Sequence, residues 1–192
     1  MASSLLVPAV RQWPWLWVVP LGVYLLLVVS VPQLRHSFAW PHLGHLRGRM
    51  IVATLALMIC TVFVLMTFQS IAQPETALFR KTLPVESLGN VFLGGVIFAV
   101  VNAVMEELVF RGILFDAIDS QWGPSITLIG TAVLFGLGHL HGYPPGTIGV
   151  VLAMLFGLAL GGLRLWTGGL LSPILAHIAA DATIYSIVAT RT

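Results

Sequence analysis

The chain has 192 residues, about the size of one domain, of which 58% are apolar and only 8% are charged. Average soluble domains are about 45–50% apolar and about 25% charged, so the composition excludes a soluble globular protein and a disordered chain. One cysteine excludes a disulfide framework, and the formal net charge of +2 comes from basic residues spread along the chain, unlike a nucleic-acid-binding surface. The composition therefore predicts an integral membrane protein whose partner is the lipid bilayer.

Six apolar stretches are predicted to span the membrane, which takes about 20 mostly apolar residues. They lie at about 13–31, 50–72, 88–115, 125–139, 147–165 and 170–189. The short loops between them predict one compact all-α, polytopic membrane helical bundle with about six transmembrane helices and with its backbone hydrogen bonds inside those helices. An aromatic belt at the membrane–water interface is expected from Trp13, Trp15, Trp17 and Trp40.

Two adjacent glutamates, Glu106 and Glu107, lie inside the third apolar stretch. An acidic side chain at the centre of a membrane helix costs about 2.5–3.5 kcal/mol even on insertion scales, so such residues indicate a function. Arg111 lies four residues after Glu107 and on the same helix face, where the two are expected to form an ion pair. Glu106 is turned about 100° away, without a partner on its own helix. It must find a partner elsewhere, face water or be protonated.

His139, at the end of the fourth stretch, is the candidate partner of Glu106. The chain is expected to turn near Trp122, and Glu106 lies 16 residues before Trp122 while His139 lies 17 residues after it. If both arms are helical, the two side chains reach a similar depth. Gly136 and Gly138 are expected to let a neighbouring backbone approach closely. His139 alone would be interpreted as a core histidine bonded to a carbonyl, but the matching depth favours a shared site.

The sixth stretch adds His177 and Asp181, which are four residues apart and share one helix face. Taken alone, the two side chains would be interpreted as a structural pair that satisfies each other's polar groups. Three membrane helices nevertheless each carry one or two ionisable residues, and ionisable groups that converge inside a membrane indicate a functional site.

The chemistry of such a site is restricted by motifs that the chain lacks. It has no His-Glu-x-x-His zinc motif, no Gly-x-Ser-Gly motif of rhomboid-type serine proteases and no Gly-x-Gly-Asp motif of presenilin-type proteases. A carboxylate can take a proton from a water that a histidine orients, and a second histidine can donate to the oxyanion on an attacked carbonyl. The residues therefore predict a hydrolytic site without a covalent intermediate, a metal or another cofactor.

Three segments, in chain order, resemble the motifs of the CPBP family of type II CAAX prenyl endopeptidases and bacteriocin-processing enzymes. They are Glu106-Glu107-x-x-x-Arg111, Phe135-x-x-x-His139 and His177-x-x-x-Asp181. The resemblance covers about residues 88–190 and implies an intramembrane glutamate endopeptidase. It divides the single membrane domain into residues 1–87, with two N-terminal transmembrane helices and loops, and residues 88–192, the CPBP-like catalytic helical core.

The resemblance also implies roles for the first two motifs. Glu106 would be the general base for water, with His139 as its partner. Glu107 would pair with Arg111 and hold the site together, and Phe135 would support it.

For the third motif, the resemblance implies an oxyanion pocket made by His177 and the residue at position 181. The best-known pattern of the family has Asn at that position, where this chain has Asp181. An ionised aspartate cannot donate a hydrogen bond to an oxyanion. Asp181 therefore either stays protonated or orients His177 instead.

The family also suggests a substrate class and a location. We expect cleavage of a membrane-associated peptide or protein near the membrane surface, by a multi-pass enzyme of a prokaryotic cell (inner) membrane. The short chain and loops resemble the prokaryotic branch of the family, where prenylated substrates are not expected.

Two other readings remain open. Glu106, His139 and His177 can supply three zinc ligands with water at the fourth position, which would make a zinc-dependent membrane endopeptidase. The same polar residues can instead form a proton or transport path, or be relics in a bacteriocin-immunity scaffold without enzymatic activity.

Overall fold

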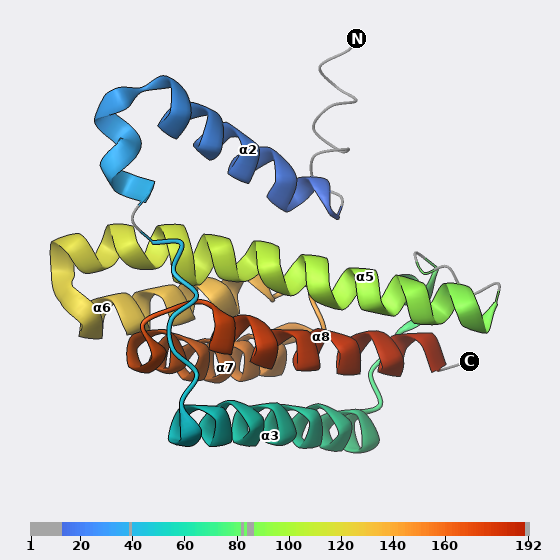
Figure 1. Ribbon diagram of the computed structural model, residues 1–192. Helices are drawn as coiled ribbons and strands as arrows, with labels where there is room; N and C mark the ends of the chain where they lie inside the picture. Colours follow the sequence, from blue (N-terminus) through green and yellow to red (C-terminus); the bar gives the residue numbers. More distant parts are fainter. Residues whose placement is uncertain (1–12, 39, 82, 84–86, 191–192) are drawn as a thin grey trace, which may run out of the picture.

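The computed structural model describes residues 13–38, 40–81, 83 and 87–190 (Figure 1). Its helices are α2 (Trp15–Ser30), the 3₁₀-helix η1 (Pro32–Phe38), α3 (Gly48–Ala72), α4 (Ala77–Arg80), α5 (Leu88–Glu107), the π-helix η2 (Leu108–Leu114), α6 (Phe115–Gly138), α7 (Gly146–Thr167) and α8 (Leu171–Thr190). The described residues include no strand, which confirms the predicted all-α class.

Among the described residues, four helical segments are long and apolar enough to cross a membrane: α3, the 51-residue run Leu88–Gly138, α7 and α8. The long run contains the third and fourth predicted spans, since it reverses direction at a kink. The first predicted span corresponds to α2, which has 16 residues and is shorter than a typical transmembrane helix. The protein is therefore an integral, multi-pass membrane helical bundle, with about six apolar helical segments as predicted.

The kink is at Gly123, next to the predicted turning point. Its φ of 74° and ψ of 173° are not helical, and glycine adopts this region far more readily than any residue with a Cβ atom. Nothing lies within 4 Å of the position that a Cβ atom would take, so the backbone conformation and not crowding requires glycine. Pro124 then begins the return helix, where its missing N–H is not needed.

The helix that carries the two glutamates does not stay α-helical over the whole of the stretch 88–115 that was predicted to span the membrane. Directly after Glu107 it widens into the π-helix η2. Such π segments occur often at functional sites, because they change the direction of the side chains that follow. Arg164 of α7 donates from Nε to the carbonyl oxygen of Arg111 at 3.2 Å, which ties η2 to α7.

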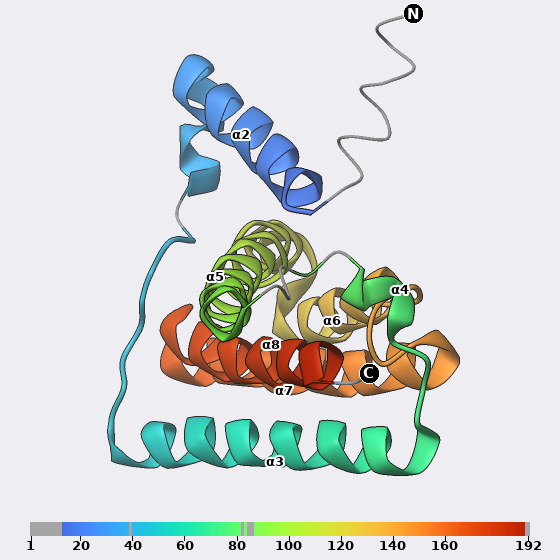
Figure 2. The same cartoon turned by 90° about the vertical axis from the view of Figure 1, so that its right-hand side faces the viewer.

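The view turned by 90° shows how the helices are layered (Figure 2). Helix α3 forms one side, α7 and α8 lie in the middle, α5 and α6 form the opposite side, and α2 lies beyond α5. Helix α6 packs on α7, and α8 packs on both α5 and α3. Gly136 permits the contact of α6 with α7, since a Cβ atom there would lie 2.8 Å from the carbonyl oxygen of Val150. The same expectation was wrong for Gly138, which faces open space.

The segment between η1 and α3 passes along the bundle to α3 (Figure 1) and forms backbone hydrogen bonds with the turn between α7 and α8. The His45 N–H donates to the carbonyl oxygen of Thr167 at 2.8 Å. Trp40, at the start of this segment, is only 3% exposed and packs on Gly112 of η2, where a Cβ atom would lie 2.5 Å from the Trp40 ring. Its assignment to the aromatic belt was therefore wrong.

Candidate active site

The last turn of α5 places Glu106 and Glu107 inside the bundle, where their residues are 6% and 0% exposed. Successive residues of a helix point about 100° apart, so the two carboxylates face different neighbours. Each carboxylate requires hydrogen-bond donors, because burial of an unpaired charge is costly. The identity of those donors distinguishes the two glutamates.

Glu107 forms a buried ion pair with Arg111, as their spacing predicted. Arg111 Nη1 donates to Glu107 Oε1 at 2.8 Å, and Nη2 donates to the carbonyl oxygen of Gly157 at 3.2 Å. The guanidinium carbon also lies 4.4 Å from the centroid of the Phe135 ring, a cation–π contact. Both charged side chains are fully buried, so removal of either one would leave the other as an uncompensated buried charge.

His177 of α8 contacts both glutamates. Its Nδ1 lies 2.7 Å from Glu107 Oε1. Its Nε2 lies 3.8 Å from Glu106 Oε2 and 3.7 Å from Asp181 Oδ1. Because a carboxylate oxygen accepts, Nδ1 is the donor in the first contact, and Nε2 is left to face the other two carboxylates.

His139, which directly follows α6, reaches Glu106 from the other arm of the hairpin. Its Nδ1 lies 2.8 Å from the carbonyl oxygen of Phe135. A carbonyl only accepts, so Nδ1 carries a proton and Nε2 of the neutral ring is an acceptor. This Nε2 lies 4.0 Å from Glu106 Oε2, which confirms that the two side chains reach the same depth.

Asn102, one helical turn before Glu106, belongs to the cluster although none of the three motifs contains it. Its Nδ2 donates to Glu106 Oε1 at 3.1 Å and to Asp181 Oδ2 at 3.2 Å. The expectation that Glu106 has no partner on its own helix was therefore wrong. The sequence did contain a signal for this contact. Asn102 and Glu106 are four residues apart inside an apolar span, and this spacing places the amide and the carboxylate on one helix face.

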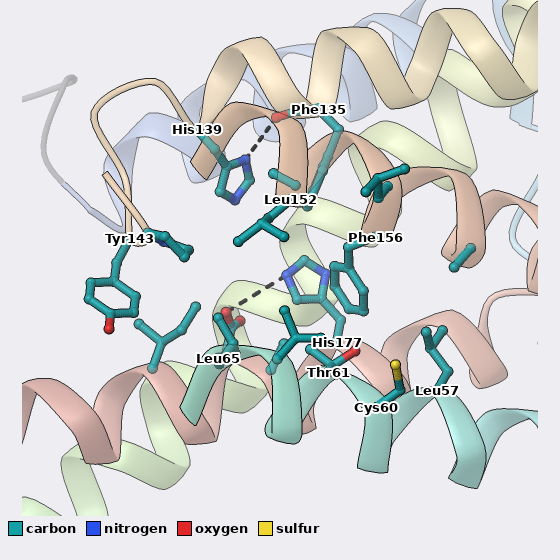
Figure 3. A pocket seen from close by; sticks show the side chains of 18 residues that line it. Leu57, Cys60, Thr61, Leu65, Phe135, His139, Tyr143, Leu152, Phe156 and His177 are labelled. Carbon is teal, nitrogen blue, oxygen red and sulfur yellow. Dashed lines mark hydrogen bonds and ion pairs between the residues drawn. The ribbon is translucent and has the colours of Figure 1, made fainter. Parts of the chain in front are cut away.

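The cluster adjoins a cavity of about 330 Å³ between α3, α7 and α8. His139, His177 and Asp181 belong to its wall, most of which is apolar and includes Leu57 of α3 and Phe156 of α7. Figure 3 shows both imidazoles pointing into this cavity, that of His139 from the end of α6 and that of His177 from α8. A mostly apolar cavity with a few convergent polar groups is the usual form of a binding site for an apolar ligand or side chain.

A metal centre is not preformed in the part of the chain that the structure describes, where no three His, Cys, Asp or Glu side chains are arranged to hold an ion. In the zinc reading, Glu106 Oε1 and His177 Nδ1 are already occupied by Asn102 and Glu107. The atoms left for a metal are Glu106 Oε2 and the Nε2 atoms of His139 and His177. A zinc ion and a catalytic water would therefore occupy the same place, because each would bind the same three atoms.

Comparison with known proteins gives one match. A family model described as type II CAAX prenyl endopeptidase Rce1-like matches residues 88–183, which is half of the chain. The matched segment runs from the first residue of α5 into α8 and contains all seven site residues that the motifs predicted. No curated protein and no solved structure matches the chain.

Proposed function

This chain belongs to the type II CAAX prenyl endopeptidase Rce1-like family, and we propose that it hydrolyses a peptide bond of a membrane-associated peptide or protein with water that Glu106 activates. At the family level it is a CAAX-type membrane protease. The catalytic base, the roles of the two histidines and the substrate are our proposal.

The observation that carries the proposal is the distance of 4.0 Å between Glu106 Oε2 and His139 Nε2. Both atoms are acceptors when the carboxylate is ionised and the imidazole is neutral, so they cannot bond to each other. A water molecule has two donors, and two hydrogen bonds of about 2.8 Å at a near-tetrahedral angle span about 4.5 Å, close to this separation. Such a water would donate to both residues and turn a lone pair toward the cavity.

In this mechanism Glu106 accepts a proton from the water while the water oxygen attacks the carbonyl carbon of the substrate. The oxyanion that forms needs a donor, and His177 Nε2 lies 3.8 Å from Glu106 Oε2. Since Nδ1 of His177 already donates to Glu107, Nε2 is a second donor only when the ring is protonated. Glu106 then returns its proton to the leaving amine, which completes hydrolysis without a covalent intermediate.

Asp181 has a supporting role in the proposal. Its Oδ2 accepts a hydrogen bond from Asn102, and its Oδ1 lies 3.7 Å from His177 Nε2. An acceptor in this position favours the protonated, donating form of His177 by charge. We therefore assign Asp181 to the orientation of His177, in preference to direct donation to the oxyanion.

Glu107 and Arg111 hold His177 in place in this scheme. This assignment of Glu107 and Arg111 is based on the shared oxygen Glu107 Oε1, which accepts from both Arg111 Nη1 and His177 Nδ1. The ring of Phe135 covers the guanidinium and supports the same arrangement. A rigid, buried support of this kind keeps reacting groups at fixed distances.

The apolar cavity suits a substrate that arrives from the membrane. Its wall would accept an apolar side chain or a lipid anchor, and its polar groups include His139, His177 and Asp181 of the proposed catalytic cluster. We propose a prokaryotic cell-membrane enzyme that cuts near the membrane surface.

Reconstituted protein tests the proposal directly. The full chain in liposomes is given a quenched-fluorescent CAAX peptide, in prenylated and unprenylated forms. We expect Glu106→Gln to lower kcat by about 100- to 10,000-fold, the usual contribution of a general base. Glu75→Gln, at an exposed carboxylate outside the cluster, is the matched control.

The alternatives give different results in the same experiment. Equal cleavage by wild type and Glu106→Gln contradicts the proposed base, and a proton current across liposomes that Glu106→Gln abolishes, without cleavage, supports the transport reading. Comparative proteomics of membrane and secreted fractions, with wild type or Glu106→Gln in the cell, identifies the natural substrate.

A further inference from the structure

The side-chain amide of Asn102 has partners from three parts of the chain. Its Nδ2 donates to Glu106 Oε1 at 3.1 Å and to Asp181 Oδ2 at 3.2 Å. Its Oδ1 accepts from Trp13 Nε1 at 3.1 Å. Asn102 is only 7% exposed, and these bonds use both of its donors and one lone pair of its acceptor.

The indole of Trp13 determines the orientation of this amide. Turned by 180°, the amide would point its oxygen at the carboxylates, which also only accept. The Trp13 N–H can only donate, so it requires the oxygen of Asn102 and directs the nitrogen toward the cluster. Packing on Phe98 of α5, with 5.5 Å between ring centroids, holds the Trp13 ring in place.

We propose that Asn102 is a positioning residue for Glu106 and that Trp13 sets the orientation of the Asn102 amide. This inference rests on the proposed function, in which Glu106 activates water. The hydrogen bond from Asn102 occupies Glu106 Oε1 and leaves Oε2 turned toward His139 and His177, at 4.0 and 3.8 Å. The hydrogen bond from Asn102 thereby determines that Oε2 is the oxygen of Glu106 that accepts the proton from water.

The same nitrogen joins Glu106 of α5 to Asp181 of α8. Two neighbouring carboxylates repel each other, and a shared donor between them offsets this repulsion. Neither Asn102 nor Trp13 is among the residues that line the cavity, so we expect their replacement to change the chemical step and not substrate binding. Trp13 also lies outside residues 88–183, so the N-terminal part of the chain contributes to a site that the family segment carries.

Four variants of the full chain in liposomes test this inference with whichever form of the CAAX peptide, prenylated or unprenylated, the wild type cleaves. Asn102→Leu is expected to lower kcat by about 10- to 100-fold, the effect of losing a hydrogen bond to a charged group, with KM unchanged. Trp13→Phe removes the N–H but keeps an aromatic ring, and is expected to lower kcat less. The double variant is expected to equal Asn102→Leu, because Trp13 acts through Asn102.

The matched control is Trp17→Phe. Trp17 packs on Phe110 at 5.9 Å between ring centroids, and its change to Phe preserves that contact. We expect its kcat to equal that of the wild type. The inference would be overturned if the double variant lowered kcat by the product of the two single effects, or if the variants changed KM alone. Should Asn102→Leu fail to fold, a kcat of Trp13→Phe equal to that of the control overturns it as well.

A second measurement does not depend on cleavage. A lipid-soluble carbodiimide modifies protonated carboxyl groups, and mass spectrometry follows its addition to Glu106 at fixed pH in detergent. The donor of Asn102 favours the carboxylate, so Trp13→Phe and Asn102→Leu are expected to raise the rate at least about threefold. An unchanged rate overturns the inference. If wild type leaves both forms of the peptide intact, or Glu106→Gln cuts them as the wild type does, the proposed function fails, while the carbodiimide rate still decides the role of Asn102.

Discussion

His177 Nδ1 lies 2.7 Å from Glu107 Oε1, and the same oxygen accepts from Arg111 Nη1 at 2.8 Å. One carboxylate oxygen thus joins α5, η2 and α8. Glu106, the preceding residue, instead receives Asn102 on Oε1 and turns Oε2 toward the two histidines. Adjacent glutamates, which are costly in a membrane, therefore have different partners because the helix separates their directions by about 100°.

Arg111→Ala is expected to lower both stability and activity. The change leaves Glu107 as a buried charge without its guanidinium, which costs about 3–5 kcal/mol. The stability of Arg111→Lys should lie between those of the wild type and Arg111→Ala. Lysine keeps the positive charge but lacks the second planar donor that reaches the Gly157 carbonyl. Thermal unfolding in detergent measures the effect, with the exposed Arg49→Ala as control. Equal melting temperatures for Arg111→Ala and wild type would show that the pair is not buried.

Gly136→Ala is expected to lower stability, and Gly138→Ala is expected not to lower it. A Cβ atom at position 136 would overlap the Cγ atom of Met154 and lie 2.8 Å from the carbonyl oxygen of Val150, so α6 and α7 must separate, at about 1–3 kcal/mol for such overpacking. Position 138 is open, and alanine there should be neutral or stabilise by about 0.5–1 kcal/mol as a better helix former. Thermal unfolding compares the two, and similar losses in both would contradict the α6–α7 packing.

Much of the helix order and part of the site could be predicted because they depend on local rules. Helix rise and a turn next to Trp122 were enough to bring Glu106 and His139 to the same depth. The spacing of four residues was enough for Glu107 and Arg111. Both predictions need only the geometry of one helix or one hairpin.

The remaining features depend on packing between segments far apart in the sequence. Trp13 and Asn102 are 89 positions apart, and no local pattern connects them. The π-helix η2 is a shift in backbone hydrogen bonding that has no composition signal. The burial of Trp40 depends on the space beside Gly112, so a rule that places tryptophan at membrane interfaces was misleading.

Metal chelation separates the water reading from the zinc reading. We expect o-phenanthroline and EDTA to leave cleavage by reconstituted protein unchanged, because the proposed base and donors are side chains alone. Elemental analysis of the active protein should find less than stoichiometric zinc. Loss of cleavage on chelation, with recovery when zinc is added back, would support zinc held by Glu106 and the two histidines.

Chemical modification of Cys60 tests whether the cavity receives the substrate. Cys60, the one cysteine of the chain, is exposed on α3 and lines the cavity. A lipid-soluble maleimide on its thiol should block part of the volume of about 330 Å³ and slow cleavage severalfold, mainly through KM. Cys60→Ala should remain active and become insensitive to the reagent.

The matched control moves the thiol by one residue. In Cys60→Ala/Ile59→Cys, the new cysteine points about 100° away, at a position that is 71% exposed and not part of the cavity wall. Its modification should leave cleavage unchanged, because bulk on that face meets lipid. Complete modification of wild-type Cys60 with undiminished cleavage would mean that the substrate reaches Glu106 without entering this cavity.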